Sequence, residues 1–489
     1  MKSNKILIVG GGSAGWMAAA TLINQFPNKD ITVIESPNIP TVGVGESTLG
    51  KINDWLELLG IKDKDFMPYT DASYKLSIRF EDFYKKNDGG FHYPFGDVIG
   101  DKELWFLKKK LNPKTPITDY ANQHYYNMAY VNQNKIDVND VTSAYHFDAT
   151  KFGLWLKDHY CKPRGVKHIL EDVNTIETNE DGIISLNNNY KADMFIDCTG
   201  FKSLLLGDTL KEHFNDYSSL LPNNKAWATR VPYKDKENEL VSYTNCTAIE
   251  NGWVWNIPSW ERIGTGYVYS DKYVTDEEAL NEFKKHLDKN GSDYSSSKFK
   301  NIKMRVGIHD RLFVKNVCAI GLSAGFIEPL ESNGLLSVHE FIINLVKVMK
   351  RGDEDTISQW DRDSFNLKCK TFFDDFTEFV AMHYALSHRD DTKYWRDVTN
   401  KSFYDNHITN GFSSTMNSKM TQGETIKNES GVHCICTGLR YFTTDILIDD
   451  SNNHHKRQIN YRNEEVIQWN DSIKDKPILL KYLKENIHA

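Results

Sequence analysis

Residues 5–26, KILIVGGGSAGWMAAATLINQF, decide the fold of this chain. They form the pattern of a short apolar strand, a glycine turn and an alanine-rich helix, and residues 31–36, ITVIES, follow as a second apolar strand. Gly10, Gly12 and Gly15 fit the spacing G-x-G-x-x-G. In that spacing the first glycine permits a tight turn, the second lets the backbone approach a pyrophosphate, and the third lets the helix pack on the strand. The segment therefore predicts a β-α-β unit whose helix N-terminus holds phosphates.

The second strand ends in Glu35, twenty residues after Gly15, where a carboxylate accepts hydrogen bonds from ribose hydroxyls. No arginine follows to receive a 2′-phosphate, so the fingerprint predicts FAD or NAD rather than NADP. The fingerprint alone does not choose between FAD and NAD. An ordinary glycine turn without a ligand is the alternative. It does not explain why the first strand, the helix, the second strand and Glu35 all fit a dinucleotide-binding unit.

The composition is that of an ordinary globular protein. The chain has 489 residues, 40% of them hydrophobic and 26% charged, and 59 Lys+Arg against 67 Asp+Glu give a net charge of −8. This mildly acidic balance provides no basic footprint for nucleic acid, and no apolar run reaches the roughly 18 residues that span a membrane. The glycines at 10–12 also end the first apolar run well short of a signal peptide. We expect neither a nucleic-acid partner nor a membrane partner.

Seven cysteines are spread thinly along the chain, and their odd number is not typical of a disulfide framework. This predicts a reducing, cytoplasmic location. Cys434 and Cys436 would share one face if they lie on a strand, but no second Cys or His pair at metal spacing follows, and His433 adds little. We expect these two cysteines to be buried structural residues and expect no metal site.

Two later segments predict further strands. Residues 192–201, ADMFIDCTGF, form an apolar strand that ends in Cys-Thr-Gly, and residues 316–350 contain a strand, a turn rich in glycine and serine, and a long amphipathic helix after Pro329. The turn Ser332–Asn333–Gly334 would expose backbone N–H groups at the positive end of that helix, where an anion can bind. An ordinary helix N-cap is the alternative.

The run GWVWNIP at 252–258 resembles the GWxWxIP motif of the flavin-dependent halogenases, the family that includes the tryptophan halogenases. Further blocks resemble the same family in the same order: GGGSAGWMAAA (10–20), GVGEST (43–48), ASYKLSIRF (72–80), YHFDATKF (145–152), ADMFIDCTG (192–200), RIGTGYVYS (262–270), IGLSAGFIEPLES (320–332) and HYALSHRDDTKYW (383–395). The resemblance covers roughly residues 1–400. The chain is identified on these blocks as a member of this family.

The resemblance implies FAD, used as FADH2 with O2, and a halide ion. The implied flavin-binding positions are Gly10, Gly12, Ser13, Ala14, Gly15, Glu35, Gly45, Glu46, Ser47 and Gly321. Trp253 and Trp255 would stand beside the flavin and keep the organic substrate away, so that the oxidant made there meets halide and yields hypohalous acid; otherwise they are core aromatics. The halide would lie at Ser332, Asn333 and Gly334, and the family usually has Thr where Asn333 stands, which affects the size of the anion pocket.

The resemblance also implies two catalytic residues. Alternation along residues 73–80 alone would make Lys75 a solvated strand lysine, but it matches the essential lysine that receives hypohalous acid through an internal tunnel. A halamine and a hydrogen-bonded hypohalous acid are both chemically open at that lysine. Glu331 matches the essential glutamate, which stabilises the cationic arene intermediate and helps remove its proton; alone it would be an acid that stabilises a helix start.

The substrate region departs from the tryptophan halogenases. Where they carry a segment like FYHLFG, this chain has FHYPFG at 91–96, so that Tyr93 replaces a substrate-contacting histidine and Phe95 is the second predicted substrate residue. Residues 411–430, where that family has an aromatic-rich stretch, are polar and nearly devoid of rings. We therefore expect a wider arene site, electron-rich substrates of the indole or phenol type other than free tryptophan, and a preference for bromide or iodide over chloride.

The expected architecture is an α/β fold with a Rossmann-like FAD-binding core of the flavin monooxygenase type and a mainly helical C-terminal substrate region. The FAD-binding module would span 1–350, with its core in 1–90, 140–215 and 300–350 and with strands carrying the double-Trp motif in 216–299. Residues 97–140 and 351–489 would cover the substrate site. No second nucleotide fingerprint is present, so a separate NADH-dependent flavin reductase would supply reduced flavin. The oligomeric state stays open, with a homo-oligomer allowed, and an aromatic hydroxylase or a non-catalytic FAD-binding protein is the alternative function.

Overall fold

The protein is described from a computed structural model that places residues 1–39, 46–101, 103–351, 355–400, 429–441 and 453–489. The chain forms two compact units, each built from three separate stretches of sequence. The first unit comprises Met1–Ala72, His146–Lys225 and Ile302–Thr377, and the second comprises Ser73–Tyr145, Ala226–Asn301 and Glu378–Ala489. Residues 351–377 thus belong to the first unit and 378–489 to the second.

The first unit contains a six-stranded sheet in the order β19-β20-β11-β1-β2-β8. Its strands are Phe313–Val314 (β19), Val317–Ala319 (β20), Met194–Asp197 (β11), Lys5–Val9 (β1), Asp30–Glu35 (β2) and Lys167–Leu170 (β8). All neighbours are parallel except β19 and β20. Helix α1 (Ser13–Gln25) connects β1 to β2, so the predicted β-α-β unit and the Rossmann-like α/β class are confirmed.

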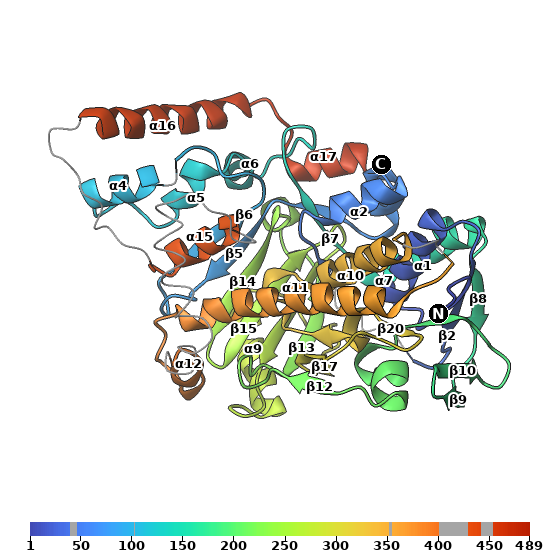
Figure 1. Ribbon diagram of the computed structural model, residues 1–489. Coiled ribbons are helices and arrows are strands. Elements are labelled where there is room, and N and C mark those ends of the chain that lie inside the picture. Colours follow the sequence, from blue (N-terminus) through green and yellow to red (C-terminus); the bar gives the residue numbers. More distant parts are fainter. Residues whose placement is uncertain (40–45, 102, 352–354, 401–428, 442–452) are drawn as a thin grey trace. The chain divides into compact units, whose positions relative to one another are not determined.

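Helices cover this sheet because its central strands are apolar on both faces. The buried length of α1 packs against α7 (Ala149–Trp155) and α10 (Gly334–Met349), which lie beside it in Figure 1. The remaining elements of the unit are α2 (Ile52–Leu59), α3 (Asp63–Phe66), β3 (Glu46–Ser47), β9 (Ile176–Asn179), β10 (Gly182–Leu186), β12 (Phe214–Asp216), β18 (Gly307–His309) and β21 (Gly325–Phe326). The alanines of α1 allow this close approach of neighbouring helices.

The second unit contains a seven-stranded sheet in the order β17-β13-β16-β15-β14-β5-β6. Its strands are Lys300–Lys303 (β17), Lys225–Val231 (β13), Ile263–Tyr269 (β16), Gly252–Pro258 (β15), Tyr243–Ile249 (β14), Ser77–Glu81 (β5) and Gly90–Pro94 (β6). Strands β14, β15 and β16 form an antiparallel meander, β5 runs parallel to β14, and β6 returns antiparallel to β5. The double-tryptophan strand β15 therefore lies in the middle of the sheet.

Helix α9 (Asp276–Lys289) covers one face of this sheet. Its Ala279 and Phe283 share a buried cluster with Val254 and Tyr267. A capping box between Thr275 and Glu278 begins the helix, with Thr275 accepting from the Glu278 backbone N–H. Because side chains alternate along a strand, Trp253 and Trp255 project from the face opposite to Val254 and α9.

The rest of the second unit is mainly helical. The helices are α4 (Glu103–Leu111), α5 (Asp119–His124), α6 (Asn127–Gln133), α8 (Lys236–Glu239), α12 (Lys393–Val398), α15 (Glu429–Gly438), α16 (Asn453–Ser472) and α17 (Leu479–Asn486). Helix α11 (Gln359–Ala385) begins in the first unit and ends in the second. Helix α16 packs on α4, α5 and α6, and α15 packs on β6 (Figure 1). The helical character expected for the C-terminal region is therefore confirmed for its described residues.

Cys434 and Cys436 lie on helix α15, so the strand geometry considered for them is wrong. Positions two apart on a helix point to different sides rather than to one face. Both are buried, and the Cys434 thiol donates to the Tyr125 hydroxyl oxygen at 3.3 Å. All seven cysteines are buried, and in the described part of the chain none forms a disulfide.

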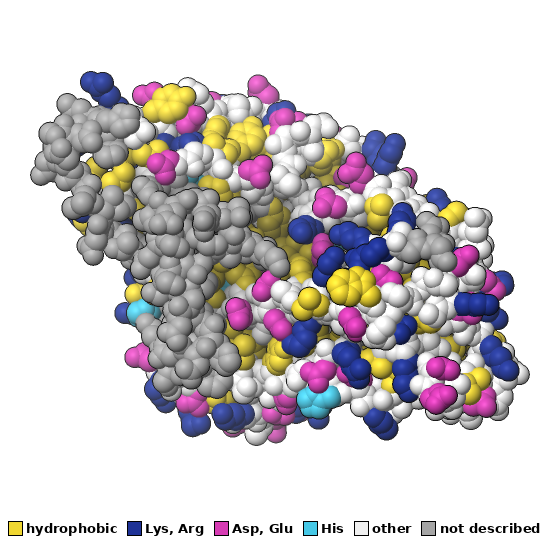
Figure 2. All heavy atoms as spheres, viewed as in Figure 1, with side chains coloured by type: hydrophobic (Ala, Val, Ile, Leu, Met, Phe, Trp, Pro, Cys, Tyr) yellow, Lys and Arg dark blue, Asp and Glu magenta, His cyan; other side chains and the backbone are white. Residues whose placement is uncertain are grey.

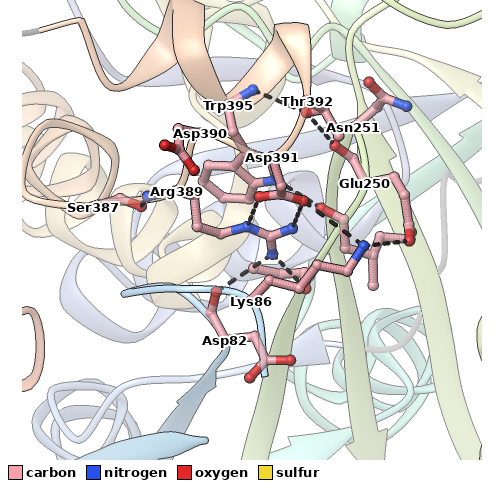
Figure 3. A network of polar contacts seen from close by, with 12 residues as sticks. Asp82, Lys86, Glu250, Asn251, Ser387, Arg389, Asp390, Asp391, Thr392 and Trp395 are labelled. Carbon is pink, nitrogen blue, oxygen red and sulfur yellow. Dashed lines mark hydrogen bonds and ion pairs between the residues drawn. The ribbon is translucent and has the colours of Figure 1, made fainter. Parts of the chain in front are cut away.

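The motif HYALSHRDDTKYW forms a buried clamp around Arg389 in the second unit (Figure 3). The Arg389 guanidinium makes two hydrogen bonds to the Asp391 carboxylate, at 2.9 and 2.8 Å, and donates to the Ala248 carbonyl at 2.9 Å. Trp395 donates its indole N–H to the Ile249 carbonyl at 2.7 Å, and Thr392 donates to the Glu250 carbonyl at 2.8 Å. The segment between α11 and α12 is thereby fastened to the end of β14, just before the double-tryptophan strand.

Charged side chains of both signs are interspersed over the face shown in Figure 2, as the composition predicts. Among the described residues, no helix combines the length and the apolar character that a membrane span requires.

Candidate functional site

At Gly10 and Gly15 the turn after β1 leaves no room for a side chain. Gly10 has φ of +113°, and a Cβ there would lie 2.2 Å from the Cys198 carbonyl oxygen. A Cβ on Gly15 would lie 1.9 Å from the Gly10 carbonyl oxygen. Gly12 is the N-cap of α1 and, being glycine, contributes no side chain that caps the helix start. This turn fits a pyrophosphate, because the backbone approaches closely and N–H groups at the helix start are left for an anion.

Two other predicted flavin positions lie against the same turn. Gly321, with φ of +73°, is so close to α1 that a Cβ on it would lie 2.9 Å from the Ala14 Cβ. Ser13 uses its hydroxyl to donate to the Ala149 carbonyl at 2.8 Å, which ties the start of α1 to α7. The structure therefore brings Gly321 to the fingerprint, although more than 300 residues separate them in sequence.

Glu35 lies at the end of β2, beside the glycine turn. A Cβ on Gly11 would lie 2.2 Å from the Glu35 carboxyl carbon. The Glu35 Oε2 atom is 2.9 Å from His168 Nε2 on β8, and the His168 ring in turn contacts Trp16 edge to face. No sequence signal pointed to His168, whose position depends on the pairing of β2 with β8. The place of Glu35 fits a role toward a ribose at the edge of a Rossmann-like sheet.

The predicted flavin-contacting loop is described in part. Gly45 lies outside the described residues, whereas the backbones of Glu46 and Ser47 form β3, which pairs with β7 (Ala144–Phe147). The Ser332 hydroxyl donates to the Ser47 hydroxyl oxygen at 3.1 Å, and both residues are buried. The structure thus brings the loop and the predicted halide turn together within the first unit.

The predicted halide turn precedes α10. Ser332 adopts a left-handed conformation with φ of +57°, which is uncommon for a residue other than glycine. Asn333 is the N-cap residue, but its side chain makes no capping hydrogen bond, and its buried Oδ1 atom has no hydrogen-bond partner among the described residues. Because the side chain does not cap the helix, the turn is not an ordinary N-cap, and the helix start offers N–H groups to an anion.

Glu331 directly precedes this turn, in a short 3-10 segment (Pro329–Glu331), and its side chain is completely buried. A residue that only stabilised the dipole of α10 would be expected at the surface, where Asp and Glu mostly lie. Burial in a dry environment strengthens the electrostatic interactions of a carboxylate.

Lys75 lies in the second unit on strand β4 (Ser73–Lys75) and is completely buried. The interpretation as a solvated strand lysine is therefore wrong, and it failed because both faces of this segment are covered. The Lys75 Nζ atom lies 5.0 Å from the centroid of the Phe95 ring, within the range of a cation–π contact. The Ser73 hydroxyl donates to the Pro258 carbonyl at 2.6 Å and so ties the lysine strand to the end of β15.

Trp253 and Trp255 are buried on the same face of β15, with ring centroids 6.2 Å apart. A Cβ on Gly266 of the neighbouring strand β16 would lie 2.2 Å from the Trp255 ring. The glycine therefore provides the space that this indole occupies. The pattern RIGTGYVYS contains the signal for this packing, but only the register of β15 with β16 shows which glycine faces the ring.

Tyr93 and Phe95 form an aromatic group beside Lys75. Their centroids are 6.1 Å apart with the rings nearly perpendicular, and Tyr93 makes a second edge contact with Phe379 of α11. The contacts with Phe379 and with Gly431 of α15 were not predicted. Residues 411–428, the greater part of the segment where the ring-poor substrate region was expected, lie outside the described part of the chain.

The fold and these features define a class of protein, a flavoprotein with a Rossmann-like core, a buried lysine and a double-tryptophan strand. Comparison with known proteins gives the family, because residues 5–446 match the model of the tryptophan halogenase family. The chain belongs to this family.

Curated relatives and solved structures agree with this result. The chain is 33% identical to tryptophan 6-halogenase SttH of Streptomyces toxytricini over 439 residues, which cover 82% of each chain. It is 34% identical to tryptophan 7-halogenase RebH of Lentzea aerocolonigenes over 426 residues, which cover 81% of this chain and 78% of the relative. The apo structure of VirX1 superposes with a TM-score of 0.90 at 36% identity and covers 100% of both chains. The crystal structure of SttH gives a TM-score of 0.84 at 28% identity and covers 98% of this chain and 99% of its own.

The protein is therefore an enzyme, a flavin-dependent halogenase. The family is two-component, so a separate flavin reductase and an aromatic substrate are its partners.

Proposed function

We propose that the protein halogenates electron-rich aromatic compounds of the indole or phenol type, other than free tryptophan, through hypohalous acid that reaches Lys75. The observation that carries this proposal is the complete burial of Lys75 against the Phe95 ring. Burying an ammonium is costly unless it is paired or hydrogen-bonded, and buried ionisable groups are frequent at functional sites. The contact with Phe95 places an aromatic surface directly beside the amino group.

FAD, bound as FADH2, supplies with O2 the oxidant that converts halide to hypohalous acid. In the proposal Gly10, Gly12 and Gly15 accommodate the pyrophosphate at the start of α1, and Glu35 accepts from the ribose. Ser13, Ala14, Gly45, Glu46, Ser47 and Gly321 complete the flavin-binding set. Trp253 and Trp255 separate the arene from the flavin. The cradle that a Cβ would fill at Gly10 and Gly15 supports this assignment.

The halide is proposed to bind at the N-terminus of α10, held by the backbone N–H groups of Ser332, Asn333 and Gly334. The absence of a capping hydrogen bond from the Asn333 side chain supports this role, because N–H groups and the helix dipole favour an anion there. We infer a preference for bromide or iodide over chloride from Asn333, which stands where the family usually has Thr. Equal turnover with chloride would contradict this preference.

At Lys75 the ammonium holds hypohalous acid by a hydrogen bond, or its amine forms a halamine with release of water. A carbon of the arene then forms a bond to the halogen as the O–X or N–X bond breaks. Glu331 is proposed to stabilise the resulting cation and to accept the ring proton, which restores aromaticity. The buried carboxylate supports this role.

The proposed substrate class rests on positions at which this chain differs from the tryptophan halogenases. Tyr93 stands where they have a histidine, and residues 411–430 contain a single ring, Phe412, where an aromatic-rich stretch would hold an indole together with its amino-acid group. We therefore propose that the arene site accepts small electron-rich aromatics and binds free tryptophan poorly.

The test is mass spectrometry of products from indoles, phenols, anilines and tryptophan. Each reaction contains a flavin reductase, NADH, FAD and either chloride, bromide or iodide. Lys75→Ala is compared with Lys85→Ala, a control at a lysine near in sequence whose Nζ atom lies over the Tyr84 ring. Halogenated products that disappear only in Lys75→Ala support the proposal. Tight, saturable turnover of tryptophan at one ring position would refute the substrate class, and hydroxylated products formed without halide would favour the aromatic hydroxylase.

A further inference from the structure

Helix α15 packs on the aromatic residues of β6 through two glycines. Gly431 and Gly438 are seven residues apart, so they lie two turns apart on the same helix face. A Cβ on Gly438 would lie 2.3 Å from the Phe91 ring. A Cβ on Gly431 would lie 2.9 Å from Tyr93 Cζ, 3.0 Å from the Tyr93 hydroxyl oxygen and 2.9 Å from Phe379 Cζ. The absence of a side chain at Gly431 therefore leaves room for the tips of two rings.

A continuous series of contacts connects this glycine to Lys75. The Tyr93 ring contacts Phe95 edge to face, with centroids 6.1 Å apart, and the Phe95 centroid lies 5.0 Å from Lys75 Nζ. These residues all belong to the second unit. The Tyr93 ring therefore contacts both the backbone of α15 and Phe95, so a change in its position changes the surroundings of Phe95, beside the place where the proposed arene reacts.

We propose that Gly431 is a specificity-determining residue, which sets the width of the arene site by giving the phenol end of Tyr93 a place outside that site. The proposal rests on the proposed function, in which the arene reacts beside Lys75. With Tyr93 seated against the backbone of α15, the site admits bicyclic electron-rich arenes such as indoles. Gly431 acts only through Tyr93 and does not itself contact the substrate.

The size of the perturbation follows from the distances. Ordinary contacts of a Cβ begin at 3.4 Å, so an alanine at 431 requires the Tyr93 tip, at 2.9 Å, to retreat by about 0.5 Å or more. Tyr93 is half-buried whereas Gly431 and Phe379 are buried, so the Tyr93 ring is the part with most freedom to move. Changes of about one methylene in an apolar pocket alter kcat/KM by roughly tenfold or more.

The experiment measures kcat/KM for indole and for phenol with the full-length enzyme, its reductase and one halide. Gly431→Ala is expected to lower the indole-to-phenol ratio of kcat/KM by about tenfold, mainly by raising KM for indole. Gly438→Ala is the matched control, because it introduces the same methyl group on the same helix face against Phe91. It is expected to leave the ratio unchanged, even if it lowers the melting temperature.

Two variants at the ring itself test whether the effect passes through Tyr93. Tyr93→Ala is expected to raise the ratio, and adding Gly431→Ala to Tyr93→Ala is expected to change it no further. The inference is overturned if Gly431→Ala leaves the ratio unaltered, or if it lowers the ratio equally with and without Tyr93. Should Gly431→Ala not fold, an unchanged ratio in Tyr93→Ala would overturn the inference.

Failure of the proposed function has a different signature. In that case wild-type enzyme yields no halogenated indole or phenol, or Lys75→Ala retains the activity. Loss of activity in Lys75→Ala together with an insensitive substrate ratio in Gly431→Ala would refute the inference alone.

Discussion

Replacement of Arg389 by methionine should loosen the end of β14 and the start of the double-tryptophan strand. The Arg389 side chain is only 1% exposed, and its guanidinium holds the Asp391 carboxylate and the Ala248 carbonyl (Figure 3). Its plane also lies over the Trp395 ring, with Cζ 4.5 Å from the centroid. Methionine preserves most of the apolar stem but none of these polar contacts, so the variant isolates the guanidinium.

The expected loss can be worked from these contacts. A buried carbonyl left without a partner costs about 1–3 kcal/mol, and loss of hydrogen bonds to a charged group costs about 1.5–3 kcal/mol. The Asp391 side chain is 23% exposed and retains Lys86 Nζ at 3.9 Å, so its contribution lies toward the lower end. We therefore expect the local free energy of opening to fall by about 3 kcal/mol.

The assay is hydrogen exchange read by mass spectrometry on peptides that cover residues 243–258. A loss of about 3 kcal/mol makes exchange from the opened state roughly a hundredfold faster. Arg396→Met is the control, since Arg396 is an exposed arginine of α12 with a hydrogen bond to the Asp390 carbonyl at 2.8 Å. If Arg389→Met exchanges no faster than Arg396→Met in these peptides, the clamp does not hold this strand end.

Two further predictions concern the glycine turn and the clamp. Gly10→Ala should abolish FAD binding in a flavin fluorescence titration, because its Cβ would lie 2.2 Å from a carbonyl oxygen; Gly60→Ala, with φ of +68° and no atom within 4 Å of its Cβ, should keep flavin. Burial raises the pKa of Asp391, but hydrogen bonds and charge from Arg389 lower it more, so its pKa lies below the ordinary 3.8. The stabilisation is therefore present above pH 3.8 and lost as the pH falls through the lower folded-state pKa. In urea unfolding Asp391→Asn should be less stable than wild type at pH 7 and indistinguishable below that pKa, and a constant difference at both pH values would contradict the assignment.

The structure bears out the parts of the sequence analysis that depend on short-range patterns. The unit β1-α1-β2 was predictable because glycine spacing, apolar runs and helix-forming alanines all lie within 31 residues, Lys5–Glu35. The strand β15 was predictable from its alternation and its final proline. The helix α15 was not, since a short run such as VHCIC has an apolar content that suits a strand and a helix equally.

The candidate site shows the same division. The glycines at positions 10, 12 and 15 could be assigned from their spacing, because residues close in sequence determine the conformation of the turn. Lys75 could not be assigned that way, because alternation shows which residues share a face but not whether another part of the chain covers that face. The contact of Ser47 with Ser332 likewise joins residues 285 positions apart, and no local pattern reports such a pair.

The sequence by itself determined the dinucleotide fingerprint, the halogenase family and the residue types available for catalysis, because these are carried by contiguous motifs. Only the tertiary structure decided that Lys75 is buried against Phe95, that Arg389 fastens the segment before α12 to β14, and that Gly431 makes room for Tyr93. Each of these depends on which distant segments pack together. Burial and close contact are properties of such packing, and so they are absent from any single stretch of sequence.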